Sequence, residues 1–401
     1  MEIATQYFPA KLSLRPSRYG TCRNRLSTNP DEYEEPPPRK PIKTKTKTNT
    51  KTNPKTNPKP KIPLSNVKSL PTNTLKGAML GDLYKLQSIL SDEDNGMVFS
   101  AVRRIDNYPV AIKSIKKDKV LFWHKIRANK KIPMEIALLR KVNAEENGNG
   151  HIGIVKLLAC FECSDCYLLI MARPTPAMDL FEYIRSREFL DEETSKIIFI
   201  QVVHAMIHCQ KSGVFHRDIK PENILIHTKT LNTTVIDFGC GTHLTAKPYK
   251  EYAGTLFYSP PEFYVAGQYH GSSSTVWSLG ILLYVMLCGQ NPFYSADEIV
   301  HGKISWPCEF GKNFGVGVGL FGETQKISFE AMDLVEKMVD KNPTKRMRMS
   351  EILLHPWLKN TVFNKKTGRV TVDVSEKSCG DFRNSCGEDS EGSSGVFEET
   401  L

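Results

Sequence analysis

The first strongly periodic part of the chain alternates apolar with polar positions. Residues 83–90, 96–102 and 108–115 each follow this two-residue period, which predicts three neighbouring β-strands. Residues 154–172 predict two further strands around a polar turn. Between these groups, residues 132–142 place apolar side chains three and four positions apart, which predicts a helix.

Helical spacing dominates after this point. Residues 179–190 and 192–213 repeat apolar side chains at three- and four-residue intervals, and Gly213 is placed to end the second helix. The longest apolar run, Ile281–Cys288, is far too short for a membrane span and predicts a buried core helix in a protein without a membrane partner. Strands first and helices later indicate the α+β class, with a small sheet-rich lobe joined to a larger helical lobe.

Both ends of the chain lack these patterns. From Lys43 the sequence KTKTKTNTKTNPKTNPKPK alternates Lys with Thr or Asn and then adds Pro, without an apolar face. Such a segment buries too little surface to offset the entropy lost on ordering it, so we expect residues 1–80 to be a disordered leader. We expect residues 359–401 to be a disordered acidic tail. The folded body is therefore predicted to span residues 81–358.

Positive charge is concentrated in the leader. The 401-residue chain carries a net charge of +10, but residues 1–80 carry +11, residues 81–358 carry +1 and residues 359–401 carry −2. The leader is either an electrostatic tether or import signal, or a solvated segment without a specific use. Because the body is nearly neutral, its charge disfavours nucleic acid as a partner, and a nucleic-acid adaptor function rests on the leader alone.

The first residues, MEIATQYFPAKLSL, lack the apolar core of a signal peptide. Ten cysteines in a chain without such a signal indicate reduced thiols. We therefore expect a cytoplasmic and/or nuclear protein.

Four short motifs carry the candidate chemistry. They are VAIK ending at Lys113, FHRDIKPENILI starting at Phe215, VIDFGCG around Asp237, and SPPE starting at Ser259. Four motifs in this order are far more specific than any one of them. Together they resemble the eukaryotic protein kinase family over residues 83–358. The resemblance implies the two-lobed kinase fold, with a small antiparallel-sheet lobe and helix C in residues 81–172 and a larger helical lobe in residues 173–358.

The resemblance also implies a Ser/Thr protein kinase that uses ATP and Mg²⁺. Asp218 would accept or orient the proton of the substrate hydroxyl, and Lys220 would neutralise charge on the transferred phosphoryl group. Lysine at this offset is typical of the Ser/Thr-specific branch. Asn223 and Asp237 would hold Mg²⁺, a hard cation that prefers oxygen ligands.

Three more residues complete the implied catalytic set. Lys113 would contact the α- and β-phosphates, and Glu135 on the predicted helix would hold Lys113 in place. Thr255 would contact Asp218 and help to select hydroxyl substrates.

Further details are similar to the Pim family of Ser/Thr kinases. Pro174 stands in the hinge between the lobes and has no N–H, so one of the two usual adenine hydrogen bonds cannot form, while the carbonyl of Ala172 remains as an acceptor. Thr275 stands where most kinases place Asp. Glu251 stands where the Pim family carries an acid. We expect it to order the activation segment through Arg217, without phosphorylation.

The glycine-rich loop of the family is degraded in this chain. Its three glycines correspond to Ser91, Glu93 and Gly96, and residues 92–94 are all acidic. Side chains there hinder close approach of the backbone to phosphate, and an exposed charge costs about 1 kcal/mol, so we expect weakened ATP binding. Two interpretations stay open: an active kinase that needs a high ATP concentration, and a pseudokinase that acts as a scaffold.

The nucleotide is expected between the lobes. Beside Lys113 and Asp237, the expected contacts are Leu90, Gly96, Val98, Ala111, Met171, Ala172, Leu225 and Ile236.

The family also prefers basic protein substrates. Asp179 and Glu182 lie three apart on a predicted helix and would share one face, and Glu222 lies in the catalytic loop. Carboxylates pair well with substrate arginine, although ordinary solvated acids are the alternative. Asp297 and Glu298 are weaker candidates of the same kind. We expect a monomer that acts on proteins with basic residues near the target Ser or Thr.

Two other patterns are set aside. Gly317, Gly319 and Gly322 form a GxGxxG pattern, but no βαβ unit surrounds it, and it falls in an insertion between late helices. Cys160 and Cys166 flank Cys163 at regular spacing without a nearby fourth ligand, which favours a strand–turn–strand over a zinc site.

Overall fold

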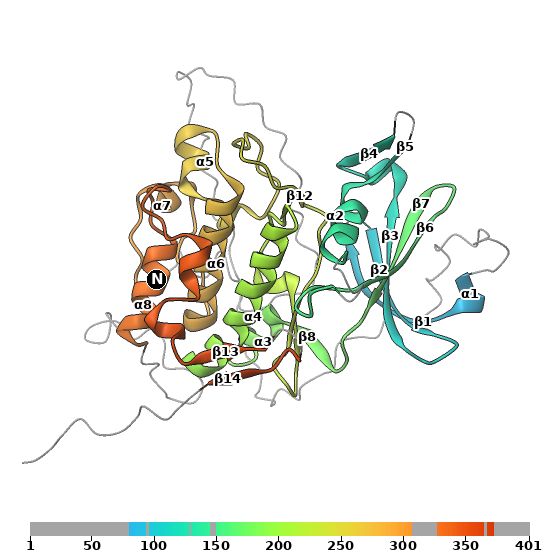
Figure 1. Ribbon diagram of the computed structural model, residues 1–401, viewed down its shortest axis with the longest axis horizontal. Coiled ribbons are helices and arrows are strands. Elements are labelled where there is room, and N and C mark those ends of the chain that lie inside the picture. Colours follow the sequence, from blue (N-terminus) through green and yellow to red (C-terminus); the bar gives the residue numbers. More distant parts are fainter. Residues whose placement is uncertain are drawn as a thin grey trace, which may run out of the picture.

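The computed structural model describes residues 80–93, 96–127, 130–144, 150–306, 327–364 and 367–372. The leader up to residue 79, the glycine-rich segment 307–326 with its GxGxxG pattern, and residues 373–401 lie outside the described residues. The remainder forms two lobes, one built on a sheet and one mainly helical (Figure 1). This is the predicted two-lobed α+β architecture.

The small lobe is built on a five-stranded antiparallel sheet of order β1-β2-β3-β7-β6. Its elements are α1 (Leu80–Leu83), β1 (Tyr84–Glu93), β2 (Gly96–Arg103), β3 (Pro109–Lys116), β6 (Leu157–Glu162) and β7 (Cys166–Ala172). All five strands were predicted from the alternating pattern. The turn between β6 and β7 carries Cys163, and Cys166 begins β7, which confirms the strand–turn–strand interpretation of that segment.

Helix α2 (Met134–Val142) is the predicted helix of this lobe. It follows directly on a two-stranded hairpin, β4 (Trp123–Arg127) and β5 (Lys130–Pro133), which was not predicted. The hairpin sequence is dominated by Lys and Arg, so it lacks the alternation of apolar and polar residues that identified the other strands.

The large lobe packs its helices around the buried α6. They are α3 (Leu180–Arg185), α4 (Glu192–Lys211), α5 (Pro261–Ala266), α6 (Gly271–Cys288), α7 (Ala296–His301), α8 (Phe329–Met338) and α9 (Met349–Ile352). Gly213, predicted to end α4, follows the C-cap Ser212 with φ +61°. Within the described residues, α6 alone is long and apolar enough to span a membrane, but 78% of that window is buried in the lobe, which fits a core helix.

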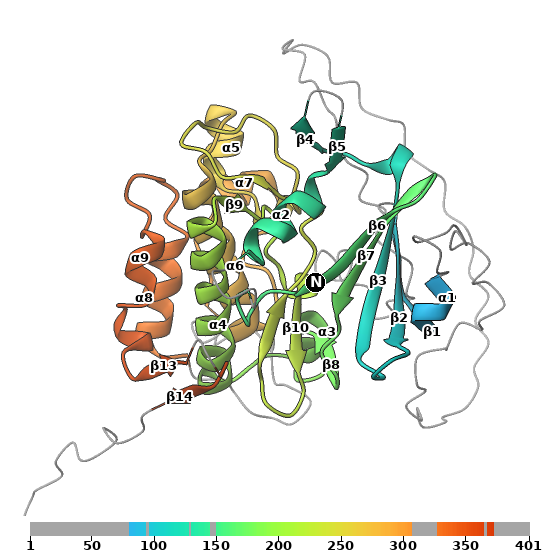
Figure 2. The ribbon, with the colours of Figure 1, turned by 45° about the vertical axis from the view of Figure 1, so that its right-hand side comes forward.

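Small sheets at the base of the inter-lobe region hold the motif segments. One has the order β11-β10-β8, built from β8 (Ala177–Asp179), β10 (Ile224–His227) and β11 (Thr233–Val235). The other pairs β9 (Val214–Phe215) with β12 (Thr242–His243). Because these strands flank the FHRDIKPENILI and VIDFGCG motifs, their pairing brings the two motifs side by side (Figure 2).

The described chain stays ordered beyond the predicted boundary at residue 358. Strands β13 (Thr361–Phe363) and β14 (Val370–Val372) form an antiparallel hairpin against α4. Phe363 is buried, with its ring 4.9 Å from that of His204 on α4. The expectation of disorder is therefore wrong for the start of the tail, because one aromatic anchor suffices to dock a segment too short to show a periodic pattern.

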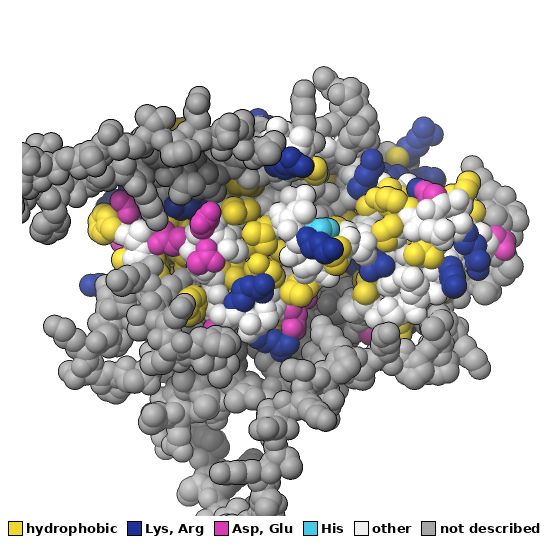
Figure 3. All heavy atoms as spheres, turned by 90° about the horizontal axis from the view of Figure 1, so that it is seen from below, with side chains coloured by type: hydrophobic (Ala, Val, Ile, Leu, Met, Phe, Trp, Pro, Cys, Tyr) yellow, Lys and Arg dark blue, Asp and Glu magenta, His cyan; other side chains and the backbone are white. Residues whose placement is uncertain are grey.

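Acidic and basic side chains are interspersed on the face of the molecule seen from below (Figure 3). This mixture agrees with the near-zero net charge of residues 81–358.

A buried ion pair ties the start of α5 to the segment before α9. Both guanidinium NH₂ groups of Arg346 lie 2.8 Å from the carboxylate of Glu262, and the two side chains are 0% and 9% exposed. Arg346 also donates to Ser273 at the start of α6. Removing the cation would leave a buried carboxylate without a partner.

Arg346→Ala should therefore destabilise the protein by about 3–5 kcal/mol and lower its melting temperature by roughly 10 °C. The matched control is Arg348→Ala, since Arg348 pairs with Glu351 while being 80% exposed, and an exposed pair contributes little to stability. Thermal unfolding followed by circular dichroism measures both variants. Equal shifts for the two would show that burial does not distinguish these pairs.

Candidate active site

Three charged side chains meet between the lobes. Lys113 Nζ lies 2.8 Å from Glu135 Oε1 and 2.7 Å from Asp237 Oδ1. Lys113 comes from β3, Glu135 from α2, and Asp237 from the segment that follows β11. Lys113 and Glu135 are buried. The structure thus joins three residues that the sequence placed in separate motifs.

The ion pairs keep this cluster charged. Burial opposes the charge on Lys113, but the carboxylates of Asp237 and Glu135 outweigh it and raise the pKa of the ammonium group. Burial likewise opposes the charge on Asp237, and Lys113 lowers the pKa of that carboxyl from 3.8 to about 2. Solvent screens part of this effect, because the Asp237 side chain is 36% exposed. The pair therefore stabilises the folded state above about pH 4, and this contribution is lost as the pH falls through 2.

The backbone around Asp237 fixes the direction of its carboxylate. Asp237 has φ +60°, a left-handed conformation that costs energy for a residue with a side chain. Its Oδ1 accepts a hydrogen bond from Gly239 N at 3.1 Å. The next residue, Phe238, is fully buried with its ring 4.7 Å from that of His216, whose Nε2 donates to Ile236 O. Both rings stand in the quoted motifs, but sequence analysis gave neither of them a role.

A second cluster surrounds Asp218. Its Oδ1 accepts from Thr255 N at 2.8 Å and from Thr255 Oγ1 at 2.7 Å. Lys220 Nζ lies 2.9 Å from Thr255 Oγ1 and 3.1 Å from Asp218 Oδ2. Asn223 Nδ2 donates to Asp218 O at 2.8 Å and Oδ2 at 3.0 Å. These contacts bring together all four predicted residues and fix the orientation of the Asp218 carboxylate.

The sheet register builds an apolar surface beside Lys113. Val98 on β2 pairs directly with Lys113, and Ala111 on β3 pairs directly with Met171 on β7. Directly paired residues share one face of a sheet, as do residues two positions apart on a strand. Val98, Ala111 and Met171 therefore line the face that carries the Lys113 ammonium group.

The large lobe contributes the opposite apolar surface. Leu225 lies on β10, and Ile236 follows β11, where its N–H donates to Asn223 O at 2.9 Å. Both side chains are half-buried. Leu90 on β1 is 51% exposed, so it contributes less enclosed surface than the other predicted residues.

The hinge between the lobes offers few hydrogen-bond donors. Ala172 ends β7, and its N–H donates to Lys156 O. The N–H of Arg173 is used by Pro109 O, and Pro174 has none. The hinge therefore presents acceptors and apolar surface to a ligand.

Comparison with known proteins identifies this arrangement. Residues 84–358, more than half of the chain, match the protein kinase domain family. The chain belongs to the protein kinase family. It is 36% identical over 278 residues to the serine/threonine-protein kinase pim-2 of Danio rerio, which covers 69% of this chain and 84% of that protein.

Other serine/threonine kinases match over the same region. The chain is 32% identical over 308 residues to serine/threonine-protein kinase prk-2 of Caenorhabditis elegans, with 74% of this chain and 65% of that one covered. It is 31% identical over 282 residues to the PAS domain-containing serine/threonine-protein kinase of Mus musculus, which covers 70% of this chain and 19% of that protein. The chain is thus a Pim-like serine/threonine protein kinase.

The surviving glycine of the kinase's degraded loop has a structural role. Gly96 has φ +140°, and a Cβ there would lie 2.1 Å from Ser114 O on β3. No other residue fits this position, whatever binds nearby. Ser91 and Glu93 lie in β1 and pair with Val98 and Gly96. The side chains of residues 93–95 lie outside the described part of the structure.

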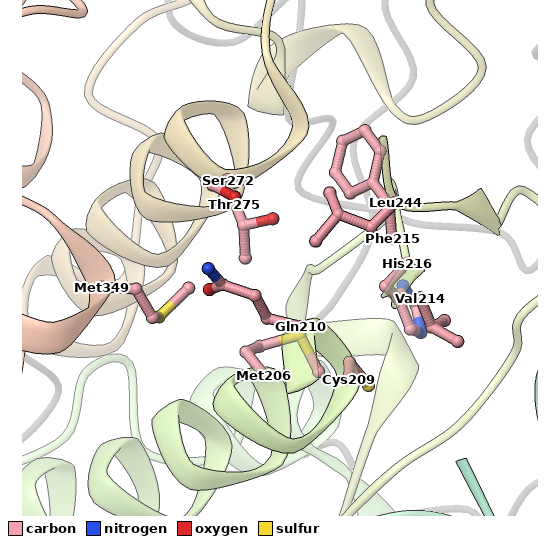
Figure 4. A pocket seen from close by; sticks show the side chains of 10 residues that line it. All are labelled: Met206, Cys209, Gln210, Val214, Phe215, His216, Leu244, Ser272, Thr275 and Met349. Carbon is pink, nitrogen blue, oxygen red and sulfur yellow. The ribbon is translucent and has the colours of Figure 1, made fainter. Parts of the chain in front are cut away.

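Thr275 stands where most kinases carry an aspartate, but it does not take over the contacts of a carboxylate. Its Oγ1 donates to Gly271 O within α6 at 2.8 Å. A small hollow remains below the catalytic loop, and Figure 4 shows Thr275 facing it from α6, next to Gln210 on α4, with His216 on the other side of the hollow. The catalytic loop is therefore held by its own contacts, such as those of His216 and Asn223, more than by α6.

The expected contact between Arg217 and Glu251 is not formed. Glu251 is exposed, while Arg217 Nε donates to Cys240 O at 2.5 Å and its guanidinium lies 5.0 Å from the Phe122 ring centre. Burial of the arginine against the small lobe leaves the carboxylate in solvent. Glu251 instead joins the fold through its backbone, whose carbonyl accepts from Tyr269 Oη at 3.0 Å.

The acids proposed to read basic substrates differ in availability. Asp179 does not share a helix face with Glu182: it is the N-cap of α3, and its carboxylate accepts from Glu182 N at 2.8 Å. Glu182 forms an ion pair with Arg185 at 2.5 Å. Glu222 is exposed by its accessible surface. Desolvation by the surrounding protein nevertheless raises the pKa of its carboxyl, and the Lys220 ammonium group opposes this rise. Among these three acids, Glu222 has the most exposed side chain.

The hydroxyl of Thr255 bridges Asp218 and Lys220. Thr255→Val should lower kcat for a serine peptide about tenfold or more, because a hydrogen bond to a charged group contributes about 1.5–3 kcal/mol. Thr255→Ser keeps the hydroxyl and should stay within about threefold of wild type. Steady-state kinetics with both variants measure the effect. An unchanged kcat in the valine variant would rule out this role for the hydroxyl.

Proposed function

We propose that this kinase transfers the γ-phosphoryl group of ATP to Ser or Thr in basic protein substrates, and that it needs no phosphorylation of its activation segment. The observation that carries the proposal is the intact ion-paired cluster of Lys113, Glu135 and Asp237 next to an oriented Asp218. We further propose a monomer, and a cytoplasmic and/or nuclear location stays a prediction from the sequence.

The residues present fit a magnesium site. Asn223 uses its amide NH₂ for two bonds to Asp218, which leaves its carbonyl oxygen for a cation. Asp237 uses Oδ1 for Lys113 and Gly239, which leaves Oδ2. Two oxygen donors on adjacent segments suit a hard cation. When held by Asn223 and Asp237, Mg²⁺ would neutralise charge on the phosphates.

The Asp218 cluster fits the transfer step. The hydroxyl oxygen of the substrate forms a bond to the γ-phosphorus while the bond to the β–γ bridging oxygen breaks, and ADP leaves. The hydroxyl proton passes to Asp218, whose carboxylate is already aimed by Thr255 and Asn223. Lys220, 3.1 Å from Asp218, neutralises charge on the transferred group.

Substrate arginine is proposed to bind chiefly at Glu222. Its exposed carboxylate lies two residues from Lys220 and four from Asp218, so a bound guanidinium sits near the reacting hydroxyl. Asp179 and Glu182 are secondary, because the helix cap and Arg185 already use them.

The activation segment is proposed to be ordered by aromatic packing. The rings of Tyr249 and Tyr252 lie 5.7 Å from that of Tyr269, and Phe263 lies 6.0 Å from the same ring. Tyr249 and Tyr269 also exchange both backbone hydrogen bonds. Burial of these rings supplies the order that a phosphate supplies elsewhere.

Asp218→Asn should reduce transfer of labelled phosphate from ATP to an Arg-containing serine peptide about 10²–10⁴-fold, because the proton acceptor is lost. The same variant should keep the Mg·ATP-induced rise in melting temperature, since Lys113 and Asp237 are untouched. Replacing the peptide arginines by alanine should raise KM about tenfold. Wild type without phosphate transfer but with a thermal shift would identify a pseudokinase, and absence of both would refute ATP use.

Phosphatase treatment should leave more than half of the wild-type activity, because the segment is held by rings rather than by a phosphate. Mass spectrometry of residues 237–262 before and after treatment confirms that any phosphate has been removed. A tenfold loss of activity that returns on rephosphorylation would contradict the proposed order of the segment.

A further inference from the structure

The β4–β5 hairpin carries four exposed cations and no acid. Lys125, Arg127, Lys130 and Lys131 are all exposed, and we call this segment, residues 123–133, the basic hairpin. Within the described residues, none of these four cations forms an ion pair with a carboxylate. The hairpin stands apart from the five-stranded sheet, beyond α2 (Figures 1 and 2).

The register of the basic hairpin places like charges directly opposite each other. Lys125 pairs with Lys131, and Arg127 pairs with Lys130. Like charges directly opposite each other disfavour the hairpin compared with neutral residues. The repulsion within the two facing pairs lowers the stability of a short two-stranded hairpin. Folding alone does not explain why these cations are present.

Two half-buried cations of the small lobe have carboxylate partners. Arg103 pairs with Asp106 at 2.6 Å, and Lys117 pairs with Glu162 at 3.0 Å. Glu162 also accepts from Tyr167 Oη. The four hairpin cations differ from these two, because no carboxylate of the described residues lies within ion-pair distance of them.

We propose that the basic hairpin is a docking site for an acidic segment of a partner protein. Because Lys130 and Lys131 are consecutive on β5, and the register shifts between Lys125 and Arg127, the two facing pairs present cations on both faces of the hairpin. An extended acidic segment that wraps the hairpin brings carboxylates to both pairs and removes the repulsion between the cations.

The surroundings favour a polypeptide over other anionic partners. Nucleic acid binding uses exposed aromatic faces for base stacking, but the Trp123 ring is covered by Lys131 Nζ, 4.3 Å from its centre. Its other neighbour is Tyr167, in an edge contact at 6.3 Å. The cationic patch is also limited to four residues on a body of net charge +1.

The docking site is connected to the catalytic elements. The hairpin leads directly into α2, which carries Glu135, and Met134 N donates to Phe122 O across its base. His124 on β4 lies 3.0 Å from His243 on β12, between ring nitrogens. A segment bound there is held next to the site of phosphoryl transfer.

Trp123 provides a local reporter of docking. The chain has four tryptophans, and the other three, Trp277, Trp306 and Trp357, are no more than 3% exposed. Acrylamide quenching of the full-length protein therefore reports mainly on the basic hairpin. Deca-glutamate in excess should protect Trp123 from quenching in a saturable and salt-sensitive manner, and Trp123→Phe should abolish the signal.

The decisive variant is Lys125→Glu/Lys130→Glu, which makes each facing pair opposite in charge and leaves Lys131 over Trp123. It should bind deca-glutamate at least tenfold more weakly while its melting temperature stays equal or rises. Lys303→Glu/Lys345→Glu, an equal charge change on exposed lysines of the large lobe, should bind within twofold of wild type. Wild-type affinity in the hairpin variant, or equal loss in the control, would overturn the proposal.

Three further probes test the nature of the partner. Inorganic phosphate, a ten-nucleotide single-stranded RNA and vesicles containing phosphatidylserine are compared with deca-glutamate at equal charge concentration. Weaker protection by all three supports an acidic polypeptide, whereas stronger protection by any of them overturns that choice of partner.

Discussion

The structure depends on the ammonium group of Lys113 being held between two carboxylates. Buried charges are stable only when paired, so the buried Lys113 and Glu135 depend on each other, and Asp237 adds a second carboxylate to Lys113. They come from β3, α2 and the segment after β11, and Asp237 is 124 positions from Lys113. Meeting this requirement fixes the sheet register, the position of α2 and the closure of the lobes together. The same contact therefore stabilises the fold and keeps the Lys113 ammonium group charged for its proposed contact with phosphate.

Sequence alone predicted the parts of the molecule in which local pattern and motif agree. The five strands, α2, α4 and the buried α6 follow from periodicity, and the residues around Lys113 and Asp218 follow from motif order. What failed depends on long-range geometry. Whether Arg217 meets Glu251 or Phe122 is decided by how the lobes pack, and the use of Asp179 as a helix cap is decided by one turn of backbone. The hairpins of residues 123–133 and 361–372 were missed because neither has an alternating apolar pattern.

A glycine in this loop can serve either the conformation of the sheet or the close approach of the backbone to phosphate. The degraded loop of this chain shows the two roles apart. Gly96 is required by the sheet itself, since a Cβ would overlap Ser114 O. Ser91 and Glu93 pair with Val98 and Gly96 within the β1–β2 ladder, so the strand accepts residues other than glycine at both positions. The loss of these glycines leaves the contacts of Lys113 with Glu135 and Asp237 in place. This is why the chemistry of the site and the composition of its lid can change independently.

The same independence applies below the active site. With Thr275 bonded inside its own helix, α6 gives the catalytic loop no carboxylate, yet Asp218 is still fixed by contacts from Thr255 and Asn223. Both of these contacts lie on the active-site side of the loop. Orientation of the proton acceptor thus relies on the activation segment, to which Thr255 belongs, more than on the core helix. In the proposed ordering of this segment, the rings packed around Tyr269 would hold Thr255 in place for this contact.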